Sequence, residues 1–175
     1  MTRAHDTIKC SIQVAEGLYH RLVLLVGEVG SGKTSVLREV AEELGLLVIN
    51  VNLVLSAELL ELTAKQRSLR LPGILEEVIR GEYREANKAN DSLAPNPSSH
   101  VAVVVLDNTE ILFDKALQQD PLRLLQGISR NRTVVASWNG TVKSGRLLYA
   151  EIGHPEYRCY DAGDALIVEM LENHE

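Results

Sequence analysis

The stretch Gly27-Glu-Val-Gly-Ser-Gly-Lys-Thr34 follows directly on the apolar run Leu22–Val26 and opens a segment with helical spacing. Its glycines at positions 27, 30 and 32 let the backbone turn tightly and point successive N–H groups inward, which makes a concave site for an anion. A helix that begins near Lys33 adds the positive end of its dipole to that site. The stretch therefore predicts a strand, a phosphate-binding loop and a helix in direct succession.

These eight residues match the pattern G-x-x-x-x-G-K-[ST] of the Walker A loop. In such a loop we expect Lys33 to reach the β- and γ-phosphates of a nucleoside triphosphate and the Thr34 hydroxyl to bind Mg²⁺. A glycine-rich turn with an incidental lysine is the competing interpretation, and the strand–loop–helix context argues against it. The residues predicted to bind the nucleotide are Gly27, Glu28, Val29, Gly30, Ser31, Gly32, Lys33, Thr34 and Ser35.

Composition indicates a globular domain, because 45% of the 175 residues are hydrophobic and 24% are charged. We expect a single domain over residues 1–175. The net charge of −6 argues against nucleic-acid binding over the whole surface, although a local basic patch is compatible with it. Two cysteines, Cys10 and Cys159, are too few for a disulfide framework and fit a reducing compartment. No apolar run approaches the roughly 18–20 residues of a membrane span, and the first residues lack the apolar core of a signal peptide. We therefore expect a cytoplasmic protein without membrane contact.

Apolar runs alternate with helical spacings along the chain, which predicts a parallel sheet of right-handed βαβ units with helices on both faces. Besides residues 22–26, strands are expected over 46–51, 101–106, 133–136, 147–150 and 165–170. Helices are expected over 7–18, from the loop to the stop at Gly45, over 56–70, from Pro72 onward, and from Asp120-Pro121. Residues 89–100, rich in Asn, Ser and Pro, predict a mobile loop.

A second motif is the apolar strand Val101–Leu106, which ends in Asp107 and has the form of a Walker B strand. A carboxylate there can hold Mg²⁺ opposite Thr34. Many P-loop ATPases place Glu directly after this Asp, but here the position is Asn108, which could polarise water without acting as a strong base. Glu110 is our candidate for the catalytic base, with Asp114 a more remote one. The alternative for Glu110 is an acid that complements a helix dipole.

Polar residues also follow the strand over 133–136. Ser137 or Asn139 could sense the γ-phosphate, and a simple turn at Asn139-Gly140 is the alternative. Just before that strand, Arg130 and Arg132 are candidates for arginine fingers that act on a neighbouring subunit's nucleotide. Basic residues that favour a helix C-terminus would look the same.

With these motifs the chain resembles the ATPase division that holds the AAA+ and RecA-like proteins, which implies a P-loop NTPase fold with three α/β/α layers and a mainly parallel five-stranded sheet. It also resembles the BrxF-type P-loop proteins of bacterial phage-exclusion (BREX) defence systems. Five stretches carry that second resemblance: residues 24–34, 106–113, 120–126, 129–133 and 153–157. The resemblance implies an ATP-using, Mg²⁺-dependent component of a multi-protein system that restricts phage DNA.

No helical lid domain is expected, because only about 30 residues follow Gly145. The adenine side is then covered by the loop over 154–160, by a neighbouring subunit, or by nothing. We expect ATP hydrolysis coupled to assembly with itself or with defence partners, and DNA contact through the oligomer or those partners. A nucleotide-gated scaffold that hydrolyses little is the alternative. A small-molecule kinase is disfavoured, because residues 56–99 offer only Lys65, Arg67 and Arg70 for an acceptor lid.

Overall fold

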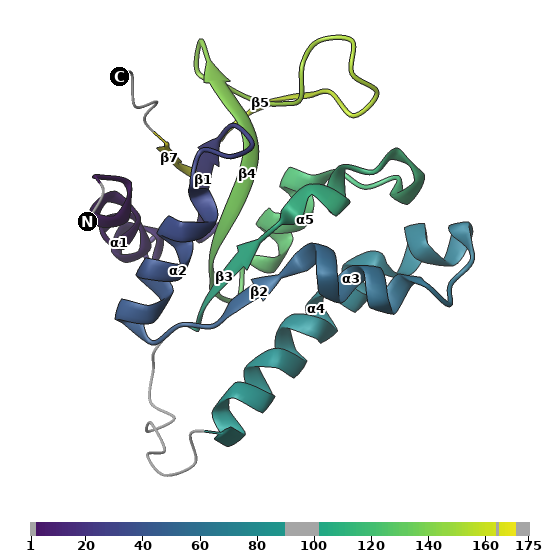
Figure 1. Ribbon diagram of the computed structural model, residues 1–175, viewed down its shortest axis with the longest axis horizontal. Coiled ribbons are helices and arrows are strands. Elements are labelled where there is room, and N and C mark those ends of the chain that lie inside the picture. The colour runs from purple at the N-terminus through teal and green to yellow at the C-terminus, as the bar shows by residue number, and fades with distance from the viewer. Residues whose placement is uncertain (1–2, 90–101, 164, 171–175) are drawn as a thin grey trace.

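The computed structural model describes residues 3–89, 102–163 and 165–170. Five strands lie side by side in the order β2-β3-β4-β1-β7, and all neighbouring strands in this path run parallel (Figure 1). These strands are β1 (Leu22–Gly27), β2 (Val48–Asn50), β3 (Val103–Asp107), β4 (Thr133–Lys143) and β7 (Leu166–Glu169). The predicted parallel sheet of five strands is confirmed, with β1 and its loop inside it rather than at an edge.

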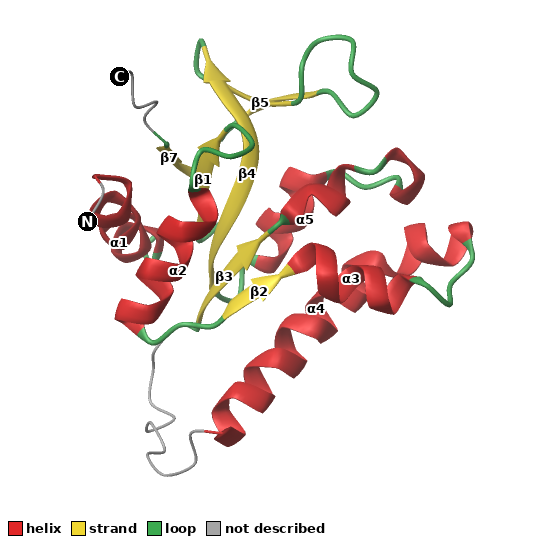
Figure 2. Ribbon diagram, viewed as in Figure 1, coloured by secondary structure: helices red, strands yellow, loops and turns green. Residues whose placement is uncertain are grey.

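Helices cover both faces of this sheet, as Figure 2 shows. Helices α1 (Arg3–Ala15) and α2 (Lys33–Leu44) pack on one face against Val23 and Leu25 of β1. The other face carries α3 (Val51–Leu59), α4 (Ala64–Ala89), α5 (Pro121–Ile128) and the short 3-10 helices η1 (Thr109–Phe113) and η2 (Lys115–Leu117). The three layers expected from the sequence are therefore present.

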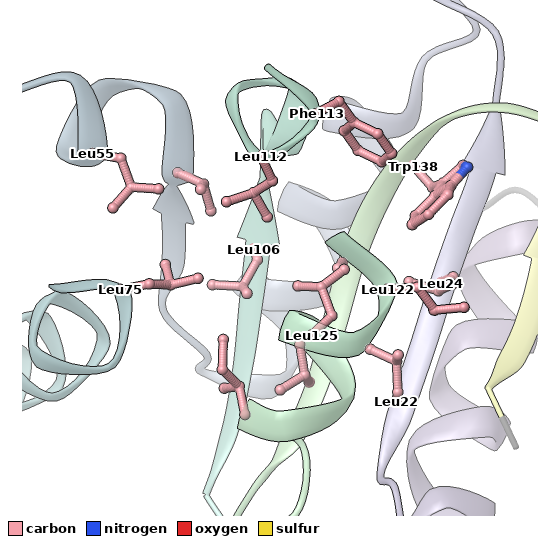
Figure 3. Close-up of a cluster of buried hydrophobic side chains, with 14 of the residues drawn as sticks. Leu22, Leu24, Leu55, Leu75, Leu106, Leu112, Phe113, Leu122, Leu125 and Trp138 are labelled. Carbon is pink, nitrogen blue, oxygen red and sulfur yellow. The ribbon is translucent and has the colours of Figure 1, made fainter. Parts of the chain in front are cut away.

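The core on the second face is drawn in Figure 3. Leu22 and Leu24 of β1, Leu106 of β3 and Trp138 of β4 meet the buried side chains of the helices there. The strands of the parallel path contribute alternate residues to the two faces, and the inner strands β1 and β3 are apolar along most of their length because both of their sides are buried. This explains why the strands were visible in the sequence as continuous apolar runs.

Strand β4 is longer than the sequence predicts, and its extension adds an antiparallel part to the sheet. It continues past residue 136 to Lys143, so Asn139 and Gly140 lie in a strand and not in a turn. The extension pairs antiparallel with β5 (Arg146–Tyr149), which pairs with β6 (Arg158–Asp161), a strand the sequence did not predict. A β-carbon on Gly140 would lie 1.8 Å from the carbonyl oxygen of Leu148, so only glycine permits this close approach.

The predicted helix over 56–70 is wrong in its bounds. Helix α3 ends at Leu59, and α4 begins at Ala64 with a reciprocal cap. The Thr63 hydroxyl accepts from the Gln66 amide at 3.4 Å, while the Gln66 side-chain oxygen accepts from the Thr63 amide at 2.9 Å. This is the capping box that the pattern Thr-x-x-Gln encodes, and it was a missed signal for the helix start.

Pro72 lies inside α4, so its predicted place at the first position of a helix is also wrong. A proline cannot donate to the carbonyl four residues earlier, which here belongs to Ser68. The Gln119 side-chain nitrogen donates to that carbonyl at 2.7 Å and satisfies it. Gln119, which lies 51 positions from Ser68 in the sequence, therefore removes part of the cost of the proline, and no local pattern reveals this.

Other boundary signals hold. Gly45 ends α2 with a φ of 64°, and Asp120 caps α5 by accepting from the Arg123 amide at 3.1 Å. Asn50 caps α3, and its side-chain oxygen accepts from the Leu53 amide at 3.0 Å. The predicted loop over 89–100 lies outside the described residues, apart from Ala89 at the end of α4. Within the ranges that the structure describes, no helix is long and apolar enough to cross a membrane.

Candidate nucleotide-binding site

The loop between β1 and α2 has the backbone that its glycines predict. β1 ends at Gly27, and α2 begins at Lys33. Gly30 and Gly32 have φ angles of 82° and 88°, a region that side chains with a β-carbon rarely adopt. Ser31 closes the turn by donating its amide to the Glu28 carbonyl at 3.2 Å. Loop residues Glu28, Val29 and Gly30 are exposed.

Lys33 is held inside this loop. Its ammonium group donates to the carbonyl oxygens of Gly27 at 2.8 Å and Glu28 at 2.7 Å, and it is 3.4 Å from the Ser31 hydroxyl. Only 6% of the residue is exposed. Burial lowers the pKa of Lys33 below its usual 10.5, and the charges of Glu110 and Asp107 partly offset this. A cation bound by neutral carbonyl oxygens gains from exchanging them for charged phosphate oxygens.

Asp107 ends β3, and its 4% exposure makes it a buried carboxylate. The strand register places it beside Asn50 at the end of β2, on the same edge of the sheet as the loop. The negative charge of Asp107 raises the pKa of Lys33 against the lowering by burial, although the two residues lie far apart in the sequence. Thr34, half-buried, is the second residue of α2 and follows Lys33 directly, while the adjacent Ser35 is exposed.

Glu110 and Asn139 meet in the structure. Glu110 lies in η1, just after β3, and Asn139 lies in β4 in register with Gly27 of β1. The amide nitrogen of Asn139 donates to a carboxylate oxygen of Glu110. The negative charge of Glu110 also raises the pKa of Lys33 against the lowering by burial. Thus the candidate base, the candidate γ-phosphate sensor and the loop lysine belong to one cluster.

Asn108 sets the turn that delivers Glu110. It has a φ of 53°, in the left-handed region, and precedes η1. Its carbonyl accepts from the Asn52 amide at 3.0 Å. The next residue, Thr109, is buried and donates its hydroxyl to the Ser137 carbonyl at 2.7 Å, which ties this turn to β4. We did not predict Thr109 to be a site residue, and only its place between Asp107 and Glu110 pointed to it.

Two other candidates take structural roles. Asp114, the remote candidate base, accepts from the Ala116 amide at 2.8 Å and caps η2. Ser137 is buried in β4, and its carbonyl serves Thr109. A role for Glu110 and Asn139 at a phosphate stays a prediction.

The two arginines lie at the other edge of the sheet. Both precede β4, whose first residues pair with the first residues of β1, whereas the loop follows the last residue of β1. Arg132 forms an ion pair with Glu76 of α4, and Arg130 is exposed, with its guanidinium 5.5 Å from the centre of the Tyr19 ring. Within this chain, neither arginine joins the cluster around Lys33. Action on a neighbouring subunit's nucleotide stays a prediction.

The side chains near the loop suit Mg²⁺ with a nucleotide better than a metal bound by protein alone. In the part of the chain that the structure describes, no three His, Cys, Asp or Glu side chains gather as a metal site. Mg²⁺ needs fewer protein ligands, because it keeps several waters and binds one or two carboxylates together with phosphate oxygens. Thr34 and Asp107 supply one hydroxyl and one carboxylate of this kind.

The comparisons with known proteins agree with this geometry. Residues 23–123 match the sequence model of the family described as "ATPase family associated with various cellular activities (AAA)". The matched range runs from β1 into α5, and it contains the loop, Asp107 and Glu110 but not Asn139. No curated protein matches the sequence significantly.

Among solved structures, the chain is similar to that of C. elegans PCH-2, with 19% sequence identity and a TM-score of 0.48. The similarity covers 95% of this chain and 41% of the PCH-2 chain, so the chain spans less than half the length of that protein.

Proposed function

Because the chain belongs to the AAA family of ATPases, we propose that it binds ATP with Mg²⁺ and hydrolyses the terminal phosphate bond at the site around Lys33. The observation that carries this proposal is the Lys33 ammonium group, which is buried in the loop and whose pKa, lowered by burial, is partly raised again by the charges of Glu110 and Asp107. A phosphoryl-transfer site needs this combination, since catalysis there consists mainly of positioning and charge stabilisation.

In this proposal each residue of the site has a separate role. The loop amides and Lys33 bind the phosphates, with Lys33 leaving its two carbonyl partners to do so. Thr34 and Asp107 hold Mg²⁺, which when bound neutralises charge on the phosphate oxygens. Glu110 orients the attacking water and accepts its proton, and Asn139 donates a hydrogen bond that fixes the Glu110 carboxylate.

A second function has its own support. Asn108 occupies the position directly after Asp107, where a strong base would follow in many P-loop ATPases, and its left-handed backbone turns the chain away at that point. Glu110 is meanwhile engaged by Asn139. A nucleotide-gated scaffold, which binds ATP to hold one conformation and hydrolyses it slowly, is consistent with both observations.

The cellular role is a finer part of the proposal. The resemblance to BrxF-type proteins supports a place in a bacterial phage-exclusion system, where nucleotide binding would control assembly with itself or with other defence proteins. Arg130 is the better candidate for action in trans, because it is exposed while Arg132 is held by Glu76. DNA contact would then come through the oligomer or its partners, in keeping with the net charge of −6.

The experiment is light scattering with and without ATP and Mg²⁺, combined with phosphate release on the same samples. We expect an ATP-dependent rise in mass and phosphate release. An assembly of the Arg130→Ala variant that still forms but releases no phosphate would support action in trans. Assembly without phosphate release in the wild type would favour the scaffold. A monomer that neither binds nor hydrolyses ATP would contradict both functions.

A further inference from the structure

The phosphate-binding loop has two different sides. The strand order β2-β3-β4-β1-β7 places β3 and β4 on one side of β1 and β7 on the other (Figure 1). Asp107, Glu110 and Asn139 all come from β3, β4 or the turn that follows β3. The side of β7 carries none of these groups. Instead, the residue that follows β7 directly is Met170.

Met170 lies against the loop itself. Its amide donates to the Val26 carbonyl at 2.8 Å, which continues the pairing of β7 with β1 up to Gly27. A β-carbon on Gly27 would lie 2.9 Å from both Cβ and Cγ of Met170, so no other residue fits there without displacing the methionine. A β-carbon on Gly32 would lie 3.7 Å from the Met170 methyl group. The side chain thus reaches from the first residue of the loop to the residue that precedes α2.

A nucleoside triphosphate has two chemically different ends, and the two sides of the loop match them. The γ-phosphate end must face the carboxylates that bind Mg²⁺ and orient water, which lie toward β3 and β4. The other end of the triphosphate then leaves the loop toward β7. We propose that the Met170 side chain is a contact surface for the nucleoside of the bound nucleotide, an inference that rests on the proposed function.

The chemistry of methionine suits this contact. Its thioether is flexible and polarisable, and it packs favourably on aromatic rings. Met170 is half-buried, in contact with the apolar layer between the sheet and helices α1 and α2. It offers no hydrogen bond that reads the edge of a base. It therefore adds affinity for a nucleoside without choosing strongly between adenine and guanine.

The segment over 154–160 was one of the predicted covers for the adenine side, and its last residue belongs to the opposite face of the sheet. Tyr160, at its end, packs on Trp138 with ring centres 5.7 Å apart. Both rings belong to the apolar layer beneath α3, α4 and α5, whereas Met170 belongs to the layer beneath α1 and α2. Among the described residues, Met170 is the apolar side chain that the structure places against the β7 side of the loop.

The test separates the two ends of the ligand. Binding of ATP and of inorganic tripolyphosphate, each with Mg²⁺, is measured by calorimetry for the wild type, Met170→Ala and Met170→Leu. We expect Met170→Ala to weaken ATP binding about threefold to tenfold, with tripolyphosphate binding unchanged. Met170→Leu should restore most of the loss, because it returns apolar surface. GTP should follow the same pattern as ATP.

Ile167→Ala is the matched control, because Ile167 is a half-buried residue of β7 that packs on the other face of the sheet. It should leave both affinities unchanged. Equal losses for ATP and tripolyphosphate in Met170→Ala would overturn the inference, since Met170 would then act only on the shape of the loop. Unchanged ATP binding would overturn it as well. If the wild type binds neither ligand, the proposed function fails first, and this inference falls with it.

Discussion

The two edges of the parallel sheet both carry polar residues, but only at one of them do these residues converge. At the edge where the strands end, Lys33, Glu110 and Asn139 come from three separate elements and form one cluster. At the edge where the strands begin, Arg132 is paired with Glu76, and Arg130 lies over Tyr19. The first edge has the arrangement of a site, and the second has the arrangement of surface contacts.

The two edges also differ in buried polar atoms that lack a hydrogen-bond partner. Within the described part of the chain, Arg21 Nε and Thr133 Oγ1 are buried without a hydrogen-bond partner at the starting edge. The polar groups at the other edge are engaged, Lys33 with two carbonyls and Glu110 with Asn139. The site edge therefore differs from the starting edge because its polar side chains are engaged by partners from several elements around one loop.

The largest expected effect at the site edge follows from Lys33→Ala. It removes the buried cation that balances the phosphates, and truncating one member of a buried charge pair costs about 2–5 kcal/mol of binding free energy. Calorimetry with ATP and Mg²⁺ should show affinity lost together with phosphate release. Lys143→Ala, at the exposed end of β4, is the control and should bind ATP normally. Normal binding by Lys33→Ala would remove the basis for calling this edge a site.

Glu110→Gln should have the next largest effect, and on rate rather than affinity. The amide cannot accept the proton of water, and loss of a general base lowers turnover about 100-fold or more. Steady-state phosphate release and calorimetry on the same variant separate the two quantities. We expect turnover to fall while ATP affinity stays within a few-fold of wild type. Unchanged turnover would show that Glu110 is not the base and would favour the scaffold.

Arg132→Ala tests the starting edge and should affect stability alone. The ion pair with Glu76 is partly buried, with the side chains 17% and 30% exposed. Its loss should cost about 1 kcal/mol, or roughly 2–4 °C in Tm for a chain of this size. Glu76→Ala should cost a similar amount, and the double variant little more than either one. A fall in ATP affinity without a change in Tm would contradict the division between the edges.

The smallest effect concerns Tyr149, which stacks on Phe113 of η1 with ring centres 3.4 Å apart. Burial raises the pKa of Tyr149 from 10.0 to about 12. The folded state therefore holds the phenol proton more tightly than the unfolded state. The resulting stability is fully present below pH 10 and is lost as the pH rises toward 12. Urea unfolding at pH 8 and 10.5 measures this loss.

Tyr149→Phe cannot ionise, so it should lose less stability than wild type over that interval, by roughly 1 kcal/mol. The variant and the wild type should have similar midpoints at pH 8, since both keep the stacked ring. An equal loss in both proteins would mean that Tyr149 is open to solvent when the chain is folded. The aromatic cluster next to the site edge would then not be the fixed support that the ring contacts indicate.

Much of the parallel sheet could be predicted, because its inner strands are buried on both faces and so read as apolar runs. The elements missed have other causes. β6 alternates between half-buried and exposed residues and looked like part of a turn-rich stretch. The helix around Pro72 was predicted wrongly because the Ser68 carbonyl, to which the proline cannot donate, accepts from Gln119, far along the chain. Local patterns report local chemistry, and the error at Pro72 arose where a distant partner decided the outcome.

The sequence by itself determined the phosphate-binding loop, since three glycines, a lysine and a threonine at fixed spacing between a strand and a helix leave few other backbones. It also determined that Asp107 ends a buried strand. Only the tertiary structure decided that Glu110 meets Asn139, that Arg132 is taken by Glu76, and that Met170 lies against Gly27. These contacts depend on strand order and register, which bring together residues that lie far apart in the chain.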